Sequence, residues 1–343
     1  MLHPWILPAV FAFGVALVVT RALVPLLQSR GVLDVPTDRS SHDAPVPRGG
    51  GIGLLAGIAA GALVAGAADA AVPGPQLWLA LAIVAGIGWL DDRVTGGLPP
   101  SLRLLVQTAA ATLAVVGTGG LDTFPLPDPA NFATGVLAYP LAMLWIVAVT
   151  NFYNFLDGID GYAGAQGLLA GVGLLLVAGL EPAAGLGAVI AGACAGFLVS
   201  NWHPARIFMG DVGSASLGFL LAAMPFHALA LAPSDLVPLV ALTLWFFLAD
   251  GVYTLVRRAA RRERVWEAHR SHVYQRLHQS GLRHDEVVLR LIGRATIVAA
   301  LAVAAVRFGE AGARWAVLAV ALLLFVGVVL RLHARERAVA ARE

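Results

Sequence analysis

Two amides and two carboxylates recur at intervals of three in one short segment: Asn151, Asn154, Asp157 and Asp160. Residues three apart are neighbours on a helix, so these four polar groups would line one wall. Gly158 and Gly161 directly follow the two acids, and glycine lets a backbone approach a planar base or a phosphate closely. A capped helix start would explain one acid but not four polar groups in register, so the spacing indicates a wall that binds a ligand.

Three further carboxylates stand at the ends of apolar segments. Asp91 and Asp92 close one segment ahead of Arg93, and Asp211 opens another in Phe208-Met-Gly-Asp-Val-Gly-Ser. Adjacent carboxylates repel each other, so we expect a cation or a proton between Asp91 and Asp92. The glycines around Asp211 suit anion binding at a helix start. The simpler interpretations are a solvated helix end held by Arg93 and a plain helix cap at Asp211.

A loop near the N-terminus carries cationic side chains suited to phosphate. Residues 34–53 contain Arg39, His42 and Arg48, together with three prolines and a triple glycine. Arginine binds phosphate oxygens bidentately, so the loop is a candidate phosphate contact. Taken alone, it would serve equally well as a basic loop that sets the topology.

Two histidines stand three apart in a later loop, His269 and His272. Such a pair suggests a metal site, but no cysteine or adjacent acid completes one, so phosphate contact is the favoured interpretation. Cys194, the only cysteine, lies in an apolar run of small residues. This excludes a disulfide within the chain and a zinc site built on cysteine.

The elements that must position these groups are apolar. The chain has 343 residues, of which 59% are hydrophobic and 13% charged, and its mean hydropathy is +0.80. Soluble domains carry about 25% charged residues, so this composition is not that of an ordinary water-soluble fold. A helix needs about 20 apolar residues to cross the bilayer. The apolar runs predict an all-α integral membrane protein with about eleven transmembrane helices, near residues 5–27, 50–67, 76–90, 104–120, 134–150, 163–180, 183–200, 213–231, 236–256, 288–306 and 314–331.

The arginines predict how the chain is oriented. All 23 basic residues are arginine, and only Arg307 and Arg314 flank an even-numbered connection. Basic residues favour the cytoplasmic side, so we expect the N-terminus outside, the C-terminus in the cytoplasm and one domain over residues 1–343. The cytoplasmic loops would be residues 28–49, 91–103, 151–162, 201–212 and 257–287, which places all the polar groups above on one face. Asp250, in the ninth segment, is a further functional candidate, with pairing to a neighbouring helix or arginine as the alternative.

Together these segments resemble the polyprenyl-phosphate N-acetylhexosamine-1-phosphate transferases, glycosyltransferase family 4. The resemblance covers nearly the whole chain, from the loop with Arg39 and His42 through Asp91-Asp92, Asn151–Gly161 and Phe208–Gly218 to the histidine loop. That last motif, His-Arg-Ser-His-Val-Tyr-Gln-Arg, is more similar to the branch that initiates O-antigen and other surface polysaccharides than to the peptidoglycan translocase. Eleven segments rather than ten favour the same branch.

The resemblance implies a reaction and its ligands. A UDP-activated N-acetylhexosamine is the donor, undecaprenyl phosphate in the bacterial inner membrane is the acceptor, and UMP leaves at the cytoplasmic face. Mg²⁺ is required, with Mn²⁺ as a substitute, and Asp211 with Asp91 or Asp92 would hold it. Asp91 is also the suspected base. The implied substrate-binding residues are Arg39, His42, Arg48, Asn151, Asn154, Asp157, Asp160, Phe208, His269 and His272.

Two alternatives stay open at this point. Within the enzyme class, the chain would be a peptidoglycan-type phospho-muramoyl-pentapeptide translocase. Outside it, intramembrane acids also mark secondary transporters, but these predict polar groups near the bilayer midplane and an internal repeat, and neither is visible. The sequence fits N-acetylglucosamine and its 6-deoxy relatives equally. No nucleic-acid partner is expected, and a homodimer is compatible with the sequence.

Overall fold

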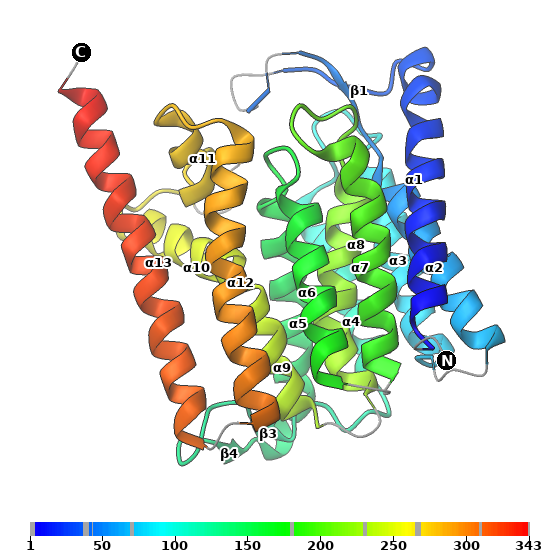
Figure 1. The fold of residues 1–343 in the computed structure, drawn as a ribbon, viewed down its shortest axis with the longest axis vertical. Coiled ribbons are helices and arrows are strands. Elements are labelled where there is room, and N and C mark those ends of the chain that lie inside the picture. Colours follow the sequence, from blue (N-terminus) through cyan, green and yellow to red (C-terminus); the bar gives the residue numbers. More distant parts are fainter. Residues whose placement is uncertain are drawn as a thin grey trace.

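Helices make up nearly all of the regular structure. The computed structural model describes residues 4–36, 41–42, 44–68, 72–178, 182–228, 232–264, 269–308 and 311–341. Most helices run side by side along one direction (Figure 1). The helices are α1 (Ile6–Ser29), α2 (Gly51–Ala67), α3 (Pro75–Asp91), α4 (Pro100–Val115), α5 (Ala138–Phe155), α6 (Tyr162–Ala178), α7 (Pro182–Asn201), α8 (Asp211–Ala223), α9 (Pro233–Thr243), α10 (Trp245–Ala260), α11 (Val273–Gln279), α12 (His284–Phe308) and α13 (Ala311–Ala340).

Short elements complete the chain between these helices. Two antiparallel pairs join β1 (Leu33–Asp34) to β2 (Val46–Pro47) and β3 (Thr123–Phe124) to β4 (Phe132–Ala133). Two 3₁₀ helices, η1 (Gly135–Leu137) and η2 (Met224–His227), precede α5 and continue α8. The pairs lie at opposite ends of the bundle, with β1 at the upper end and β3 and β4 at the lower end in Figure 1.

The long helices have the composition of membrane spans. Within the described residues, α1, η1 with α5, α12 and α13 are long and apolar enough to cross a bilayer, and α9 with α10 makes a fifth if the bent pair is one span. Shorter apolar helices include α2, α3, α6 and α7. The all-α expectation is confirmed, and the chain is a multi-pass membrane protein. The number of crossings stays a prediction.

The ninth expected segment, 236–256, is not one straight helix. The chain bends by 77° between α9 and α10, and Pro238 lies within α9. Gln166 of α6, which is fully buried, donates from Nε2 to the carbonyl oxygen of Thr243 over 2.6 Å. This carbonyl lies at the break, where the helix no longer supplies all its own hydrogen bonds. Irregular backbone is tolerated at membrane depth when protein groups satisfy it in this way.

Small residues allow the helices on one side of the bundle to approach closely. A Cβ added at Gly171 of α6 would lie 2.6 Å from the carbonyl oxygen of Gly187 of α7, and one at Gly187 would lie 2.7 Å from that of Gly171. No larger side chain fits at either position without separating α6 from α7. Such contacts are typical of membrane helices, where close van der Waals packing replaces the hydrophobic drive that water supplies.

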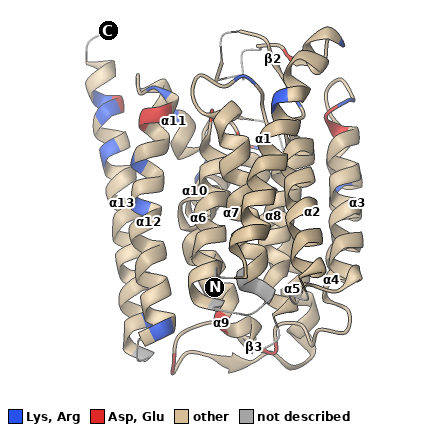
Figure 2. Cartoon of the chain, turned by 45° about the vertical axis from the view of Figure 1, so that its right-hand side comes forward, with Lys and Arg blue, Asp and Glu red and all other residues tan. Residues whose placement is uncertain are grey.

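Helix α8 lies at the centre of the bundle (Figure 1). All its residues after Asp211, from Val212 to Ala223, are buried. It packs mainly against α3 and α5. Because α8 begins at the end of the bundle where α3 and α5 finish, three sets of polar residues meet there. Figure 2 shows that charged residues gather mostly at this end, with only a few at the other.

Candidate active site

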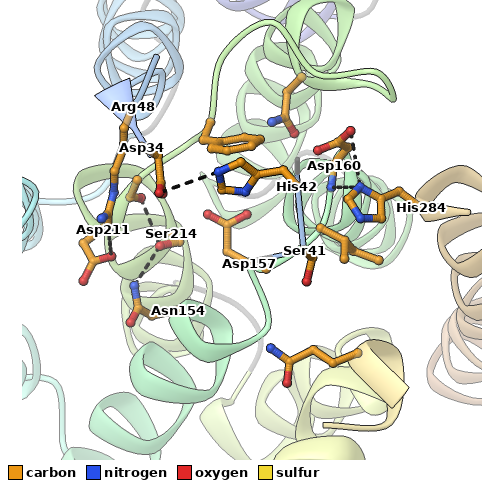
Figure 3. A pocket seen from close by; sticks show the side chains of 16 residues that line it. Asp34, Ser41, His42, Arg48, Asn154, Asp157, Asp160, Asp211, Ser214 and His284 are labelled. Atoms are coloured by element: carbon orange, nitrogen blue, oxygen red, sulfur yellow. Dashed lines mark hydrogen bonds and ion pairs between the residues drawn. The ribbon is translucent and has the colours of Figure 1, made fainter. Parts of the chain in front are cut away.

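A polar cleft of about 210 Å³ opens at this end of the bundle. Of the residues singled out in the sequence, it is lined by His42, Arg48, Asn154, Asp157, Asp160, Phe208 and Asp211. In Figure 3, Asp157 lies between Asp211 on one side and Asp160 on the other. The cleft thus brings together three of the segments separated in sequence. Arg39 lies outside the described residues.

Asp92 joins three separate parts of the chain. Its Oδ1 lies 2.7 Å from Nε of Arg48 and accepts the backbone N–H of Asp211 over 2.9 Å, while its Oδ2 accepts the N–H of Val212 over 3.0 Å. Gly210, at φ +72°, has no room for a side chain, because a Cβ there would lie 2.6 Å from Asp92 Oδ2. A carboxylate in this position satisfies N–H groups of α8 that have no partner within the helix. Both Asp92 oxygens are therefore engaged by protein groups.

Asp211 lies between two arginines. Its Oδ1 accepts from Nη2 of Arg48 over 2.8 Å, and its Oδ2 accepts from Nη1 of Arg103 over 3.3 Å. The same Arg103 nitrogen lies 3.6 Å from Oδ2 of Asp91, whose Oδ1 accepts the N–H of Leu98 over 2.7 Å. Asp91, Asp92 and Asp211 thus form one cluster with Arg48 and Arg103. Arg103 was not singled out in the sequence, because one arginine in a basic loop has no distinguishing spacing.

The electrostatics of this cluster are those of crowded carboxylates. Burial raises the pKa of Asp92 to about 6; Arg48 opposes this shift and Asp211 adds to it. Burial also raises the pKa of Asp157 well above its ordinary value, with a further contribution from Asp211. Burial alone would lower the pKa of Arg48, but the charges of Asp92 and Asp211 leave it raised. The cluster holds more negative charge than its arginines balance.

The four-residue wall expected on one helix is only half helical. Helix α5 ends at Phe155, so Asn151 and Asn154 lie on the helix while Asp157 and Asp160 lie in the turn that follows. Asn154 donates to Oγ of Ser214 over 2.9 Å and faces the cleft. Asn151 instead donates to Oε1 of Gln107 over 2.7 Å and does not line the cleft. The expectation of one continuous helical wall is wrong, although three of its members reach the cleft.

Two histidines that the sequence did not distinguish hold Asp160. Its Oδ2 lies 2.6 Å from Nδ1 of His203 and 3.3 Å from Nδ1 of His284, and it accepts the N–H of Ala205 over 3.1 Å. Burial would raise the pKa of Asp160, but the hydrogen bonds from His284 and His203 outweigh it and leave the pKa lowered. Asp160, His203 and His284 offer ligand atoms within 4.8 Å of one another. The 2.6 Å contact is a direct hydrogen bond, which is too close for two ligands of one ion.

Asp250, inside α10, is fully paired. It is 2% exposed, and its carboxylate accepts from Oγ1 of Thr254 (2.9 Å) and from the N–H groups of Val273 (2.9 Å) and Tyr274 (3.1 Å). His272 Nδ1 lies 3.0 Å from the same carboxylate. Asp250 therefore fixes the start of α11, and the pairing alternative describes its contacts.

Helix α11 in turn holds the turn that carries the acids. The hydroxyl of Tyr274 donates to the carbonyl oxygen of Phe155 over 3.2 Å. The same hydroxyl fills the space where a Cβ of Gly158 would stand. Gly158 lies between Asp157 and Asp160, so the position of α11 determines where these acids can lie.

His269 and His272 do not line the cleft. Their rings lie 4.9 Å apart, and His269 Nδ1 is 3.0 Å from Oγ of Ser271. Burial and the neighbouring His272 lower the pKa of His269 to about 4. His269 is therefore neutral at pH 7, so it can reach a phosphate only through a hydrogen bond and not through its charge.

Replacing Asp250 tests whether this carboxylate fixes α11. In Asp250→Asn, an amide N–H₂ would face donors that now meet an oxygen, so at least one buried N–H loses its acceptor. We expect a loss of about 1–3 kcal/mol in stability, seen as a lower melting temperature of the purified chain. Asp122→Asn, at an exposed position, is the matched control. An unchanged melting temperature in Asp250→Asn would contradict the role given to Asp250.

Known proteins match this chain over most of its length. The model of glycosyl transferase family 4 matches residues 75–228. The chain is 32% identical over 311 residues to a probable undecaprenyl-phosphate N-acetylglucosaminyl 1-phosphate transferase of Bacillus subtilis, covering 85% of this chain and 84% of that protein. It is 33% identical over 307 residues to the decaprenyl-phosphate N-acetylglucosaminephosphotransferase of Mycobacterium tuberculosis strain H37Rv, covering 78% and 74%.

A second group of relatives matches a shorter part of the chain. The phospho-N-acetylmuramoyl-pentapeptide-transferase of Synechococcus elongatus is 36% identical over 240 residues, covering 63% of this chain and 64% of that protein. The first group therefore shares more of the chain. With relatives of this identity and coverage, the chain belongs to glycosyl transferase family 4.

Proposed function

We propose that this chain transfers N-acetylglucosamine-1-phosphate from UDP-N-acetylglucosamine to undecaprenyl phosphate and releases UMP. The observation that carries the proposal is the cluster of Asp91, Asp92 and Asp211 with Arg48 and Arg103 at one end of a polar cleft. The names of the relatives matched over most of the chain support the sugar and the lipid class. We assign the chain to the initiation of a surface polysaccharide.

The reaction needs one bond to form and one to break. An oxygen of the acceptor phosphate attacks the donor phosphorus that carries the sugar, and the bond from this phosphorus to the oxygen of UMP breaks. The products are a lipid-linked diphospho-sugar and UMP. A phosphate monoester is already largely dianionic at pH 7, so little base catalysis is required. Positioning and charge stabilisation are the main contributions the protein must make.

The residues of the cluster fit a divalent cation. Asp91, Asp92 and Asp211 carry three negative charges when ionised, and Arg48 and Arg103 balance two of them. The unbalanced negative charge favours a cation, and Mg²⁺ uses one or two carboxylates together with phosphate oxygens. We assign Asp91 and Asp211 as the ligands of Mg²⁺, and Mn²⁺ can take the place of Mg²⁺. When bound, the ion would neutralise charge that develops on the diphosphate.

Asp92 differs from its neighbours, because both its oxygens are bound to Arg48 and to the N–H groups that start α8. It is a positioning residue in this proposal: it holds Asp211 and Arg48 in place. Arg48 and Arg103 each reach Asp211 from a different segment and can turn their remaining N–H groups toward substrate phosphates.

The other end of the cleft suits the nucleoside. Asp160 is kept ionised by its histidine and backbone hydrogen bonds, and so presents an acceptor for a base N–H. Phe208 also lines the cleft and packs edge-on against His42, with ring centroids 4.8 Å apart. In Figure 3, Asp157 lies between Asp160 and Asp211, and Asn154 lies on the side of Asp211. The phosphates would then lie toward Asp211 and the uridine toward Asp160.

We infer that the cleft faces the cytoplasm of a bacterial inner membrane. The support is that 21 of the 23 arginines fall in the loops predicted to be cytoplasmic, in the C-terminal tail or in the helix ends beside them. Cys194 is buried, so a Cys194→Ala background is suited to thiol labelling. In whole cells, an impermeant maleimide should label Asp122→Cys at the opposite end. Thr95→Cys, beside Asp92, should react only after permeabilisation, and the reverse pattern would overturn the orientation.

The donor can be tested directly. Membranes containing the chain, supplied with undecaprenyl phosphate and Mg²⁺, should convert UDP-N-acetylglucosamine into a lipid-linked product with equimolar release of UMP, measured by chromatography. Membranes without the chain are the control. A product formed only from a UDP-muramoyl peptide would assign the chain to the translocase reaction instead, and no lipid product from any UDP-sugar would favour transport.

The cluster can be divided by mutation. Asp91→Asn and Asp211→Asn remove one proposed ligand each, and we expect transfer to fall about 10²–10³-fold while the melting temperature changes little. Asp92→Asn removes the acceptor at the start of α8, and we expect it to lower the melting temperature as well as the rate. Near-normal transfer by both Asp91→Asn and Asp211→Asn with excess Mg²⁺ would remove these residues from the mechanism.

A further inference from the structure

Four arginines converge from two helices away from the cleft. Arg290 and Arg294 are four apart on α12, and Arg331 and Arg335 are four apart on α13, so each pair shares one helix face. All four line one cavity of about 250 Å³, together with side chains of leucine and valine. We call this cavity and its four arginines the arginine pocket. It has no residue in common with the polar cleft.

The charge of the arginine pocket has no counterpart in the described part of the chain. None of the lining residues is acidic. Among the described residues, the four arginines make no ion pair with a carboxylate, and Arg294 instead donates to the backbone oxygen of Arg290 over 2.5 Å. Glu336, beside Arg335 in sequence, is held by Arg276 through two contacts of 2.8 and 2.7 Å. Four like charges around one cavity repel each other, so an anion bound there would lower their electrostatic energy.

Six other arginines of the chain are paired with carboxylates. Carboxylates lie within 4 Å of the following arginines: Arg48, Arg103, Arg258, Arg276, Arg283 and Arg314. Each has an acid within the protein. The arginine pocket differs from these six arginines, because none of its lining residues is acidic.

The arginine pocket lies in the half of the bundle that contains the polar cleft. His284, the first residue of α12, lines the cleft, and Arg294 follows ten residues later, about 15 Å along the helix axis. In Figure 2, basic residues mark α12 and α13 in the half of the bundle where the charged end lies. Leu289 and Leu330, next in sequence to Arg290 and Arg331, are each 62% exposed. An anion that binds here would have apolar protein surface beside it, and a soluble ion makes no use of such a surface.

We propose that the arginine pocket binds the headgroup phosphate of an anionic phospholipid, whose acyl chains lie against the exposed leucines of α12 and α13. Guanidinium groups bind phosphate oxygens through paired, charge-assisted hydrogen bonds. Basic pockets between helices on the cytoplasmic side are suited to such lipids, since each arginine near the surface contributes about 1 kcal/mol. The bound lipid offsets the repulsion between α12 and α13 and so stabilises their packing at this end.

Lipid binding to the full chain tests the proposal. The purified protein in detergent is titrated with phosphatidylglycerol or phosphatidylcholine, and bound lipid is counted by native mass spectrometry. The wild type should bind phosphatidylglycerol at least about tenfold more tightly. Arg290→Gln with Arg294→Gln, and separately Arg331→Gln with Arg335→Gln, should each weaken phosphatidylglycerol binding about thirtyfold, the change that corresponds to about 1 kcal/mol per arginine.

Two controls separate the site from general charge. Arg337→Gln, on α13 but outside the arginine pocket, should bind phosphatidylglycerol as the wild type does. The fourfold Arg→Lys variant keeps the charge, so it should retain a preference for phosphatidylglycerol. Equal wild-type affinity for both lipids would overturn the proposal, as would full retention of the preference in both Gln variants. Displacement of the lipid by millimolar inorganic phosphate would identify a site for a free anion and would also overturn it.

Discussion

The geometry of the cleft depends on one carboxylate that binds two backbone N–H groups. Asp92 accepts from Asp211 and Val212 and also holds Arg48, so it ties the end of α3, the start of α8 and the loop before α2 to one point. These segments are far apart in sequence. Without this acceptor, the first turn of α8 would have unpaired donors beside hydrocarbon, which is costly, and Asp211 would have no fixed position. The side chains that remain available to a ligand are placed relative to this contact.

Helix α8 is held in a fixed position, because all its residues after Asp211 are buried. Gly51 at the start of α2 lies so close to Gly213 that neither has room for a Cβ, and this brings Arg48 within reach of Asp92. Close packing of the central helix at its small residues therefore prevents the carboxylates from moving apart. The acids can repel each other and still stay together, because rigid packing on three sides holds them.

Hydropathy and arginine placement anticipated the helices and the end of the bundle where the polar groups gather, since a bilayer requires long apolar runs and favours basic residues on one side. The pairing of Asp91 or Asp92 with Asp211 was implied by the family resemblance and not by the spacing of these residues. The bend in 236–256 was not predicted. Mean hydropathy does not report the direction of the chain, and Gln166, which donates to the carbonyl oxygen at the break, comes from another helix. Arg103, His203 and His284 were missed for the same reason: each is a single residue that gains its role only through contacts far away in sequence.

Two buried carboxylates near the cleft make the same kind of contact with the start of a helix. Asp92 caps α8 and Asp250 caps α11, each by accepting two consecutive backbone N–H groups. An anion at a helix start is favoured by the helix dipole, which offsets part of the cost of burying its charge near the membrane. The bend between α9 and α10 matters here, because Asp250 lies on α10 and reaches the start of α11, whose Tyr274 lies against Gly158 in the turn of Asp157 and Asp160. Carboxylates satisfied by backbone thus hold both ends of the cleft, and Asp211 and Asp157, which no backbone N–H satisfies among the described contacts, are left to meet the substrate.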